Sequence, residues 1–431
     1  MGNRNDEVSE ARFVELNDQP FRVGAVPMSS FSSRAVTRQI IRRRFSSMGL
    51  TVVSALTLIT FLAPARIPGQ TSDSGWMKRL DALIQKGLDE YHVPGLAVGI
   101  VLDGNLAYAR GFGQVTLSRP GAVTPDTLFH MASVTKPFVA TAIMQLVEQG
   151  KIAQDDPVTK HLPYFRLDDP RYKSVTIRQL LNHTSGMPDV KDYEWNKPQY
   201  DEGALERYVR SLKDEKLLWD PGARFAYSNI GFEILGDVIA KVSGMSFEDY
   251  VERQILKQVG MSSSTMLWER ADTKRLANGY TKGASSDRSA SALIPVAAYP
   301  YNRPHNPSSD LFSSVNDMAR WAMVNLNRGE LDGKRILKSS TYDLMWKPTA
   351  EVEFCRGGPC RKPGSFVGIS WFLEEKDGRL IVSHGGGDDG FISAFILVPS
   401  RKFAFVMMTN SDFAGIPLLK QIQAEALSLA K

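Results

Sequence analysis

Apolar residues recur at helical spacing in several parts of the chain, and one such stretch begins just after Ser133 and Lys136, which form a Ser-x-x-Lys sequence. Pro137 suits the first turn of a helix, where its missing N–H would have no partner inside the helix. The pattern predicts a helix that starts near Ser133 and ends at Gly150. Its predicted buried face comprises Val139, Ala142, Ile143, Leu146 and Val147.

Strand-like stretches lie at both ends of the chain. Residues 96–102 and 105–112 flank Asp103 and Gly104, a pair that accepts the positive φ of a tight hairpin turn. Further strands are predicted at residues 366–374, 379–383, 391–398 and 402–409. One-sided apolar patterns predict helices near residues 76–88 and 418–429. We therefore predict an α+β fold, in which both ends build one antiparallel sheet with the terminal helices packed on it.

The middle of the chain reads as mostly helical. One apolar helix face ends at Gly244. Ser246 and Ser314 each precede an acidic residue by three positions, a pattern that predicts the start of a helix. Residues 283–291 and 299–309 read as surface loops. The chain is thus divided into an α/β lobe at about residues 76–135 and 340–431 and a helical lobe at about residues 136–339.

The first 65 residues read as a disordered extension and a signal peptide, followed by one folded domain at residues 66–431. Residues 1–37 are polar, a cluster of arginines follows, and residues 48–63 are apolar. That run is shorter than the roughly 20 residues of a spanning helix, and Ala63-Pro64-Ala65 has the form of a signal-peptidase site. We expect export to the periplasm or medium, with transient membrane contact through this segment, rather than a permanent anchor. Met28 is an alternative start that would shorten the leader.

The net charge of +5 gives little support to a nucleic-acid partner. Residues 1–70 hold nine arginines and five acidic residues, which leaves 43 basic and 42 acidic residues for the rest of the chain. The basic excess therefore belongs to the leader, and no basic stripe with interleaved aromatic residues follows it.

The two cysteines, Cys355 and Cys360, close a short glycine-rich loop. In an exported protein they could form a disulfide or remain free thiols, and the sequence does not separate these alternatives. The six histidines form neither H-x-H nor H-E-x-x-H, so we expect no metal and no cofactor.

The Ser-x-x-Lys spacing places an amine within one helical turn of a serine hydroxyl, which is the arrangement of a nucleophile beside a base. The spacing alone is weak evidence, because Ser428 and Lys431 repeat it at the C-terminus. Two later motifs strengthen it. Tyr227 and Asn229 form the only Y-x-N sequence, and His384 begins a His-Gly-Gly-Gly run between strand-like segments.

With these three motifs in order, residues 76–425 resemble the serine β-lactamase and penicillin-binding-protein superfamily. The similarity is greatest to the branch of class C β-lactamases, D-alanyl-D-alanine carboxypeptidases and family VIII esterases. It extends to the phrases Leu-Asn-His-Thr-Ser-Gly at residues 181–186 and Ser-Val-Asn-Asp-Met-Ala at residues 314–319.

The resemblance implies acyl transfer through an acyl-enzyme on Ser133. Either Lys136, if burial or a nearby cation keeps its amine neutral, or Tyr227, if positive charge stabilises its phenolate, could take the Ser133 proton. The resemblance assigns Asn229 to the substrate amide, although a structural hydrogen bond is the alternative. It assigns the oxyanion hole to the backbone N–H groups of Ser133 and Gly387.

The third motif departs from the Lys-Thr-Gly that β-lactamases and carboxypeptidases usually carry. His384, Gly385 and Gly386 supply no hydroxyl and no fixed positive charge, because histidine is largely neutral at pH 7. Losing charge-assisted hydrogen bonds of about 1.5 to 3 kcal/mol should weaken carboxylate-bearing substrates about 10- to 100-fold. We therefore expect a small ester, amide or peptide substrate without that carboxylate. A D-alanyl-D-alanine carboxypeptidase, a β-lactamase, and a sensor that keeps the fold without turnover are the alternatives.

Other catalytic arrangements have less support. The α/β-hydrolase fold would need a G-x-S-x-G sequence, which is absent. A triad in which His384 activates Ser133 leaves Lys136 and Tyr227 without a role. His183 reads as a residue that satisfies a turn. Four further candidates read as loop residues with no assigned chemistry: Arg303, His305, Asp388 and Asp389.

Overall fold

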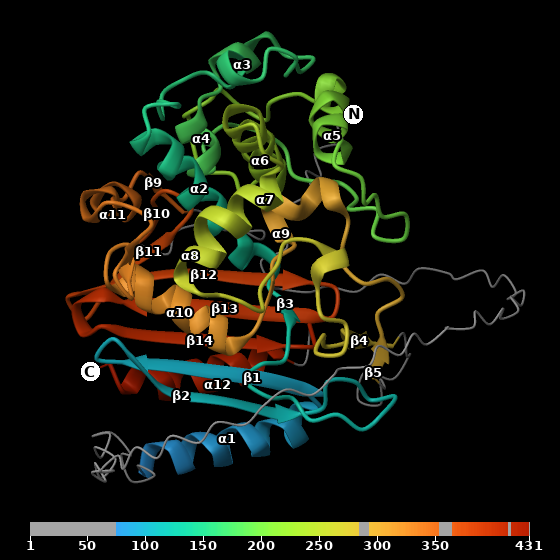
Figure 1. The fold of residues 1–431 in the computed structure, drawn as a ribbon, viewed down its shortest axis with the longest axis vertical. Helices are drawn as coiled ribbons and strands as arrows, with labels where there is room; N and C mark the ends of the chain where they lie inside the picture. Colours follow the sequence, from blue (N-terminus) through green and yellow to red (C-terminus); the bar gives the residue numbers. More distant parts are fainter. Residues whose placement is uncertain (1–74, 284–292, 353–363, 413–414, 431) are drawn as a thin grey trace, which may run out of the picture. The chain divides into compact units, whose positions relative to one another are not determined.

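The computed structural model describes residues 75–283, 293–352, 364–412 and 415–430. An eight-stranded antiparallel sheet lies at its centre (Figure 1). Its strands, in spatial order, are β2 (Asn105–Gly113), β1 (Gly95–Leu102), β14 (Phe403–Thr409), β13 (Phe391–Val398), β12 (Arg379–Asp388), β11 (Phe372–Lys376), β10 (Ser365–Val367) and β9 (Ala350–Glu351). The sheet therefore combines the two ends of the described chain, as the strand pattern predicted.

The β1–β2 hairpin turns at Asp103 and Gly104, whose φ angles are 50° and 79°. Both residues adopt the left-handed backbone conformation that a tight hairpin turn requires. On its other side β1 pairs with β14, with Leu96 opposite Thr409. The predicted hairpin and the sheet shared by both ends of the chain are thus confirmed.

The two faces of the sheet carry different helices. Helices α1 (Gly75–Tyr91) and α12 (Gly415–Ser428) pack against each other beneath one face, and α10 (Val315–Leu326) covers the other face (Figure 1). Side chains alternate along β14, so that Phe405 belongs to the core under α1 and α12, whereas Val406 belongs to the core shared with the helices on the other side. The sheet is buried on both faces for this reason.

The segment between β2 and β9 supplies most of the helices. They are α2 (Lys136–Glu148), α3 (Val158–His161), α4 (Ile177–Leu181), α5 (Ala204–Ser211), α6 (Asn229–Ser243), α7 (Phe247–Val251), α8 (Lys257–Val259), α9 (Asn306–Ser309), α10 and α11 (Ser339–Met345). Short pairs of strands interrupt them: β3 (Phe129–His130) with β6 (Phe312–Ser313), β4 (Tyr280–Lys282) with β5 (Leu293–Pro295), and β7 (Glu330–Leu331) with β8 (Lys334–Arg335). The remaining helical turns are η1 (Ala132–Thr135), η2 (Pro170–Ser174), η3 (Leu212–Asp214), η4 (Glu252–Leu256), η5 (Trp268–Arg270), η6 (Arg303–His305) and η7 (Pro399–Arg401).

Helix starts follow the predicted capping residues. The hydroxyls of Ser246 and Ser314 accept the backbone N–H of Asp249 and Asp317, respectively. The carboxylate of Asp317 accepts the N–H of Ser263. Ser314 therefore starts α10, while Asp317 ties that helix to a neighbouring loop.

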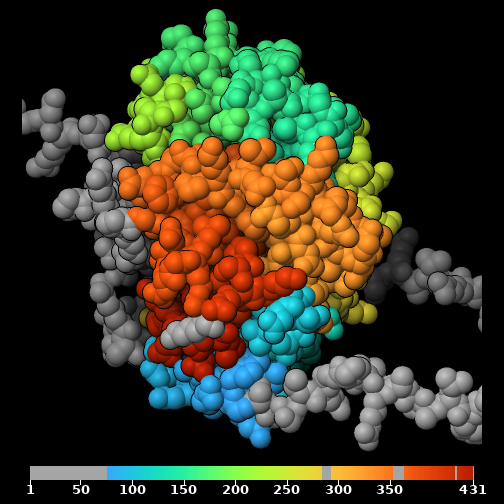
Figure 2. All heavy atoms as spheres, turned by 90° about the vertical axis from the view of Figure 1, so that its left-hand side faces the viewer, coloured from blue at the N-terminus to red at the C-terminus, as the bar shows by residue number. Residues whose placement is uncertain are grey.

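On the face shown in Figure 2, green residues of the helical segment and blue residues of α1 lie at opposite ends. Orange and red residues from the later part of the chain lie between them. On this face, the later part of the chain thus lies between α1 and the helical segment, both of which come earlier in the sequence.

One predicted strand is two strands in the structure. Residues 366–374 were expected to be continuous, but β10 and β11 are joined by a turn in which Ser370 has a φ of 65°. A Cβ on Gly368 would lie 2.3 Å from the carbonyl oxygen of Met345, so the turn packs against the end of α11. The prediction of a single strand was wrong because this contact comes from a distant segment.

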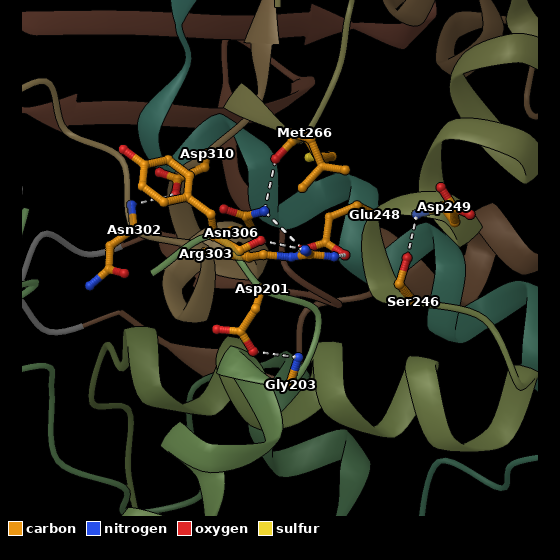
Figure 3. Close-up of polar contacts among 12 residues, drawn as sticks. Asp201, Gly203, Ser246, Glu248, Asp249, Met266, Asn302, Arg303, Asn306 and Asp310 are labelled. Atoms are coloured by element: carbon orange, nitrogen blue, oxygen red, sulfur yellow. Dashed lines mark hydrogen bonds and ion pairs between the residues drawn. The ribbon is translucent and has the colours of Figure 1, made fainter. Parts of the chain in front are cut away.

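The prediction of a surface loop at residues 299–309 was also wrong. The segment folds into η6 and α9, and Asn306 and Ser308 are fully buried. The side-chain amide of Asn306 donates to Glu248 and to the carbonyl oxygen of Met266, and Figure 3 shows Arg303 reaching the same Glu248. Polar residues suggested exposure, but buried partners satisfy them here.

Three predictions concern residues outside those that the structure describes: the leader at residues 1–65, most of the loop at 283–291, and the Cys355–Cys360 pair. Among the described residues, no helix is long and apolar enough to cross a membrane.

Candidate active site

Ser133 lies in η1, between the short strand β3 and helix α2. Ala132, directly before it, has a φ of 46°, which is left-handed and costly for a residue with a Cβ. The hydroxyl of Thr135 donates to the carbonyl oxygen of Ala132 at 2.7 Å and supports the turn. Ser133 is half-buried, whereas the residues next to it are buried. This strained turn therefore leaves the serine partly accessible.

Lys136 is fully buried, and its amine has three oxygen partners. The Nζ atom lies 2.9 Å from the Oγ of Ser133, 2.6 Å from the Oδ1 of Asn229 and 2.8 Å from the carbonyl oxygen of Ser308. The predicted contact between Ser133 and Lys136 is present. Asn229 and Ser308 bring two further elements, α6 and α9, to the same nitrogen.

Burial lowers the pKa of Lys136 to about 8, because the charged amine loses its hydration. Three carboxylates act in the opposite direction and hold the pKa up: Glu233, Asp189 and Asp388. Near neutral to mildly alkaline pH, a substantial fraction of the amine is therefore uncharged. Desolvation, rather than a neighbouring cation, is the physical cause.

Tyr227 lies just before α6, and its ring stacks on His183 with centroids 4.3 Å apart. The Nζ of Lys136 lies 5.0 Å from the centroid of the Tyr227 ring. Burial raises the pKa of Tyr227 well above 10, although a hydrogen bond with the Ser133 side chain lowers it in part. The expectation that positive charge would stabilise the phenolate is not met, since desolvation dominates.

His183 has the structural role expected from its sequence context. Its φ is 57°, and its Nδ1 accepts the backbone N–H of Ser228 at 3.1 Å. Its carbonyl oxygen accepts the N–H of Ala226. His183 therefore fixes the backbone on both sides of Tyr227.

Asn229 begins α6, and both ends of its side-chain amide have protein partners. Its Oδ1 accepts from Lys136, and its Nδ2 donates to the Oδ1 of Asp189 at 2.9 Å. The structural hydrogen bond considered for this residue is thus present. Contact with a substrate amide stays a prediction.

His384, Gly385, Gly386 and Gly387 belong to β12 itself, which continues to Asp388 instead of ending at residue 383. The pairing of β12 with β11 ends at Ser383, opposite Phe372, whereas β13 follows β12 to Asp388. Among the described strands, none pairs with residues 384–388 on the β11 side. This stretch therefore offers a strand edge beside Ser133.

Gly386 brings this edge close to the start of η1. A Cβ at this position would lie 2.4 Å from the carbonyl oxygen of Met131 and 3.0 Å from the backbone nitrogen of Ser133. Two of the predicted site segments are thus in backbone contact. Gly387 follows on the same strand, and its N–H as the second oxyanion donor stays a prediction.

The His384 side chain is buried, and its Nδ1 lies 2.7 Å from the carbonyl oxygen of Gly385. Because a carbonyl only accepts, Nδ1 carries the proton in this contact. Burial and the charge of Lys136 lower the pKa of His384 to about 3. The imidazole is accordingly neutral at physiological pH, as the sequence suggested.

Several residues around the amine were not identified from the sequence. Asp189 follows the recognised phrase at residues 181–186 by three positions and could have been noticed there. Glu233 is buried and accepts from the hydroxyl of Ser308 at 2.7 Å. Ser308 reaches Lys136 through its carbonyl oxygen, which every residue possesses, so no sequence signal could have revealed that role.

Residues read as unassigned loop positions have defined contacts instead. Asp388 ends β12 and accepts from the Nε2 of His130 at 2.7 Å and from the hydroxyl of Ser309. His305 lies 3.1 Å from Glu233 through its Nδ1. Asp389 lies in the turn after β12. The His130–Asp388 contact ties the end of β12 to the strand that leads to Ser133.

Within residues 75–283, 293–352, 364–412 and 415–430, no group of three or more His, Cys, Asp or Glu side chains is arranged to hold a metal ion.

Comparison with known proteins identifies the family of this chain. A family model described as Beta-lactamase matches residues 80–427. Protein flp of Staphylococcus aureus (strain MW2) is 28% identical over 354 residues, which are 81% of this chain and 66% of that protein. The chain thus spans slightly less than two thirds of that relative. Penicillin-binding protein 4 of Amycolatopsis lactamdurans is 29% identical over 348 residues, 79% of this chain and 85% of that protein.

Solved structures show the same fold. An octameric penicillin-binding protein homologue from Pyrococcus abyssi has a TM-score of 0.70 and 29% identity. The match covers 82% of this chain and 77% of the homologue's chain. EstCE1, a hydrolase with promiscuous acyltransferase activity, has a TM-score of 0.64 and 22% identity, with coverage of 81% and 97%. A class C beta-lactamase has a TM-score of 0.65 and 21% identity, with coverage of 84% and 98%. The latter two likenesses concern the fold alone.

Proposed function

The chain belongs to the beta-lactamase family, and from that premise we propose that it is a serine hydrolase that forms an acyl-enzyme on Ser133. One observation carries the proposal. The buried amine of Lys136, with a pKa lowered to about 8, lies 2.9 Å from the Ser133 hydroxyl. A serine becomes an effective nucleophile when a neighbouring base takes its proton, and a neutral amine at this distance can do so.

Lys136 is the first base in this proposal, and Tyr227 is the proton donor. The pKa of Tyr227 is well above 10, so its phenol keeps its proton at neutral pH. A protonated phenol beside Ser133 is better suited to supply a proton to the leaving group than to remove one from the nucleophile. The pKa shifts thus support this assignment of two roles that the sequence left open.

The proposed reaction has two steps, acylation of Ser133 and hydrolysis of the acyl-enzyme. As Lys136 takes the Ser133 proton, Oγ bonds to the substrate carbonyl carbon. The bond to the leaving alcohol or amine then breaks as that group takes the proton of Tyr227, and Lys136 returns its extra proton to Tyr227. In the second step water attacks the acyl carbon and gives one proton to this pair. The bond between the acyl group and Oγ breaks, the acid leaves, and the pair passes the proton to Oγ, which restores the Ser133 hydroxyl. The backbone N–H groups of Ser133 and Gly387 are the proposed donors to the oxyanion in both steps.

The proposed substrates are esters, amides or peptides that lack a carboxylate at the third motif. His384 is buried and its pKa is lowered to about 3, so it presents no positive charge there. Carboxylates bind most strongly to charged donors, which favours uncharged acyl groups in this site. Carboxypeptidase or β-lactamase activity remains the second candidate, since penicillin-binding proteins are among the relatives.

The test combines labelling with a substrate panel. A fluorophosphonate probe should label wild-type protein at Ser133, and p-nitrophenyl acetate or butyrate should give a higher kcat/KM than nitrocefin or a D-Ala-D-Ala peptide. Ser133→Ala should lose both labelling and turnover. Ser428→Ala is the matched control, because Ser428 has the same Ser-x-x-Lys spacing but lies exposed on α12.

No labelling of wild-type protein would refute the nucleophile, and labelling without turnover would favour the sensor alternative. Nitrocefin turnover above that of the esters would reverse the proposed order of substrates.

We also propose that the protein is exported. The support is the order of arginines, the apolar run at residues 48–63 and the Ala-Pro-Ala sequence that ends at residue 65. N-terminal sequencing of the mature protein should begin close to residue 66. An exported form that retains residue 48 would indicate an anchor instead.

A further inference from the structure

The number of hydrogens on the Lys136 amine limits how it can bind its three partners. A neutral amine has two N–H groups and one electron pair, whereas three oxygens surround the nitrogen. The carbonyl oxygen of Ser308 can only accept a hydrogen bond, but the hydroxyl of Ser133 can also donate one. The direction of the electron pair therefore depends on whether Asn229 presents its oxygen or its NH₂ group.

Asp189 determines that choice. Its Oδ1 accepts from the backbone N–H of Asn229 at 2.8 Å, from the side-chain Nδ2 of Asn229 at 2.9 Å and from the N–H of Val190 at 2.9 Å. Asp189 is 8% exposed and Asn229 is 7% exposed, so solvent gives few alternative partners. A flipped amide would place two oxygens against each other at Asp189 and an NH₂ group against the amine.

With the amide fixed, the neutral amine donates its two hydrogens to Asn229 and Ser308. Its electron pair then remains for the third partner, the hydroxyl of Ser133. We propose that Asp189 is a positioning residue that holds the Asn229 amide in one orientation and thereby aims the electron pair of Lys136 at Ser133. This inference rests on the proposed role of Lys136 as the base.

The other charged groups near the amine do not have this geometry. Glu233 contacts Ser308 and His305, and Asp388 contacts His130 and Ser309. Tyr227 faces the amine through its ring. His183 and His384 are buried nearby, and burial together with the charge of Lys136 lowers the pKa of each imidazole. Among the carboxylates that influence Lys136, Asp189 is bonded to the side-chain amide whose oxygen contacts the amine. Glu233 instead bonds the hydroxyl of Ser308, whereas the amine contacts the carbonyl oxygen of that residue.

The experiment compares Asp189→Ala, Asp189→Asn and a control. Alanine removes the acceptor, so kcat for a p-nitrophenyl ester and the rate constant for fluorophosphonate labelling should fall about 10- to 100-fold, with KM changed little. Asparagine keeps an oxygen at the Oδ1 position, so Asp189→Asn should stay within about threefold of wild type. Asp237→Asn is the matched control. Asp237 lies on α6 and, like Asp189, is a buried carboxylate, but it accepts from the hydroxyl of Tyr164 at 2.7 Å.

The labelling rate constant describes only the molecules that react. A variant that folds poorly therefore still gives the rate constant of its folded molecules. Asp189→Ala labelling at the wild-type rate would overturn the inference. Asp189→Asn as slow as Asp189→Ala would also overturn it, because charge rather than orientation would then be responsible. A similar loss in Asp237→Asn would point to a general effect of removing a buried carboxylate.

Failure of the underlying function gives a different result. If wild-type protein is not labelled at Ser133, the proposed nucleophile is wrong, and the positioning role of Asp189 falls with it. If wild type is labelled and Asp189→Ala is unaffected, the nucleophile stands and the positioning role alone is refuted.

Discussion

The α-carbon of Gly386 faces the backbone nitrogen of Ser133, and a Cβ at position 386 would lie 3.0 Å from that nitrogen. The same Cβ would lie 2.4 Å from the carbonyl oxygen of Met131, a backbone atom that cannot rotate away. This contact sets the spacing between β12 and η1. It is therefore sensitive to the smallest added side chain.

Gly386→Ala should force β12 away from η1. We expect kcat/KM for an ester to fall about 100-fold, because small displacements of reacting groups are costly, and stability to fall by about 1 to 3 kcal/mol. Gly121→Ala is the control, since its nearest heavy atom would lie 4.0 Å away. Ester kinetics and urea unfolding measure the two effects, and an alanine variant with wild-type kinetics would show that β12 does not need this close approach.

Ser133, Lys136 and Tyr227 should behave as one unit. Ser133→Ala should abolish ester hydrolysis with stability nearly unchanged, and single losses of a catalytic unit are about 10³ to 10⁶ in kcat. Lys136→Ala combined with Tyr227→Phe should lose less than the product of the separate losses. A Ser133→Ala protein that keeps a tenth of the wild-type rate would contradict the mechanism.

The rate should rise with pH through a midpoint near 8. Below the Lys136 pKa of about 8 the amine is protonated and has no electron pair, and above it the amine is neutral and can take the Ser133 proton. Esters without an ionisable group, assayed from about pH 6 to about pH 9, report this as the profile of kcat/KM. A profile flat over that range would argue against Lys136 as the base.

Glu233→Gln provides an electrostatic test of the same amine. The charge of Glu233 raises the pKa of Lys136, so its removal should move the midpoint to lower pH. Glutamine retains an oxygen for the Ser308 hydroxyl, which limits the change to charge. A shift to higher pH would show that Glu233 does not stabilise the protonated amine.

The Arg303–Glu248 pair should matter for stability rather than for chemistry (Figure 3). The two side chains are 12% and 4% exposed, and the pair holds the segment that brings Ser308 to Lys136. Arg303→Ala leaves a buried charge uncompensated, which costs about 3 to 5 kcal/mol. The free energy of unfolding in urea measures this loss.

Arg207→Ala provides the comparison, because Arg207 and Asp201 are 53% and 60% exposed. Exposed pairs contribute about 1 kcal/mol or less. Equal losses of unfolding free energy in the two arginine variants would mean that the buried Arg303 pair contributes no more to stability than the exposed Arg207 pair.

Local signals in the sequence predicted the elements whose structure is decided locally. The turn at Asp103 and Gly104 and the Ser133–Lys136 spacing depend on neighbouring residues, and both are present. The prediction failed where distant residues decide. Residues 299–309 are buried because Glu248 and Met266 satisfy them.

The electrostatic surroundings of the site were predicted only in part. The sequence suggested that burial would lower the pKa of Lys136, and it does. It also suggested that positive charge would favour the Tyr227 phenolate, but the cost of desolvation cannot be judged before the depth of burial is known. Backbone acceptors such as the carbonyl oxygen of Ser308 leave no trace in the sequence.

The pairing of β1 with β14 has a consequence for how the chain is made. Leu96 lies opposite Thr409, so β1 has no partner on the β14 side until the chain has been synthesised through residue 409. Contacts so distant in sequence form slowly, and a growing chain would keep the apolar face of β1 exposed. A ribosome that stops before residue 403 would release a product unable to complete its sheet, and such truncated chains should be degraded or aggregate.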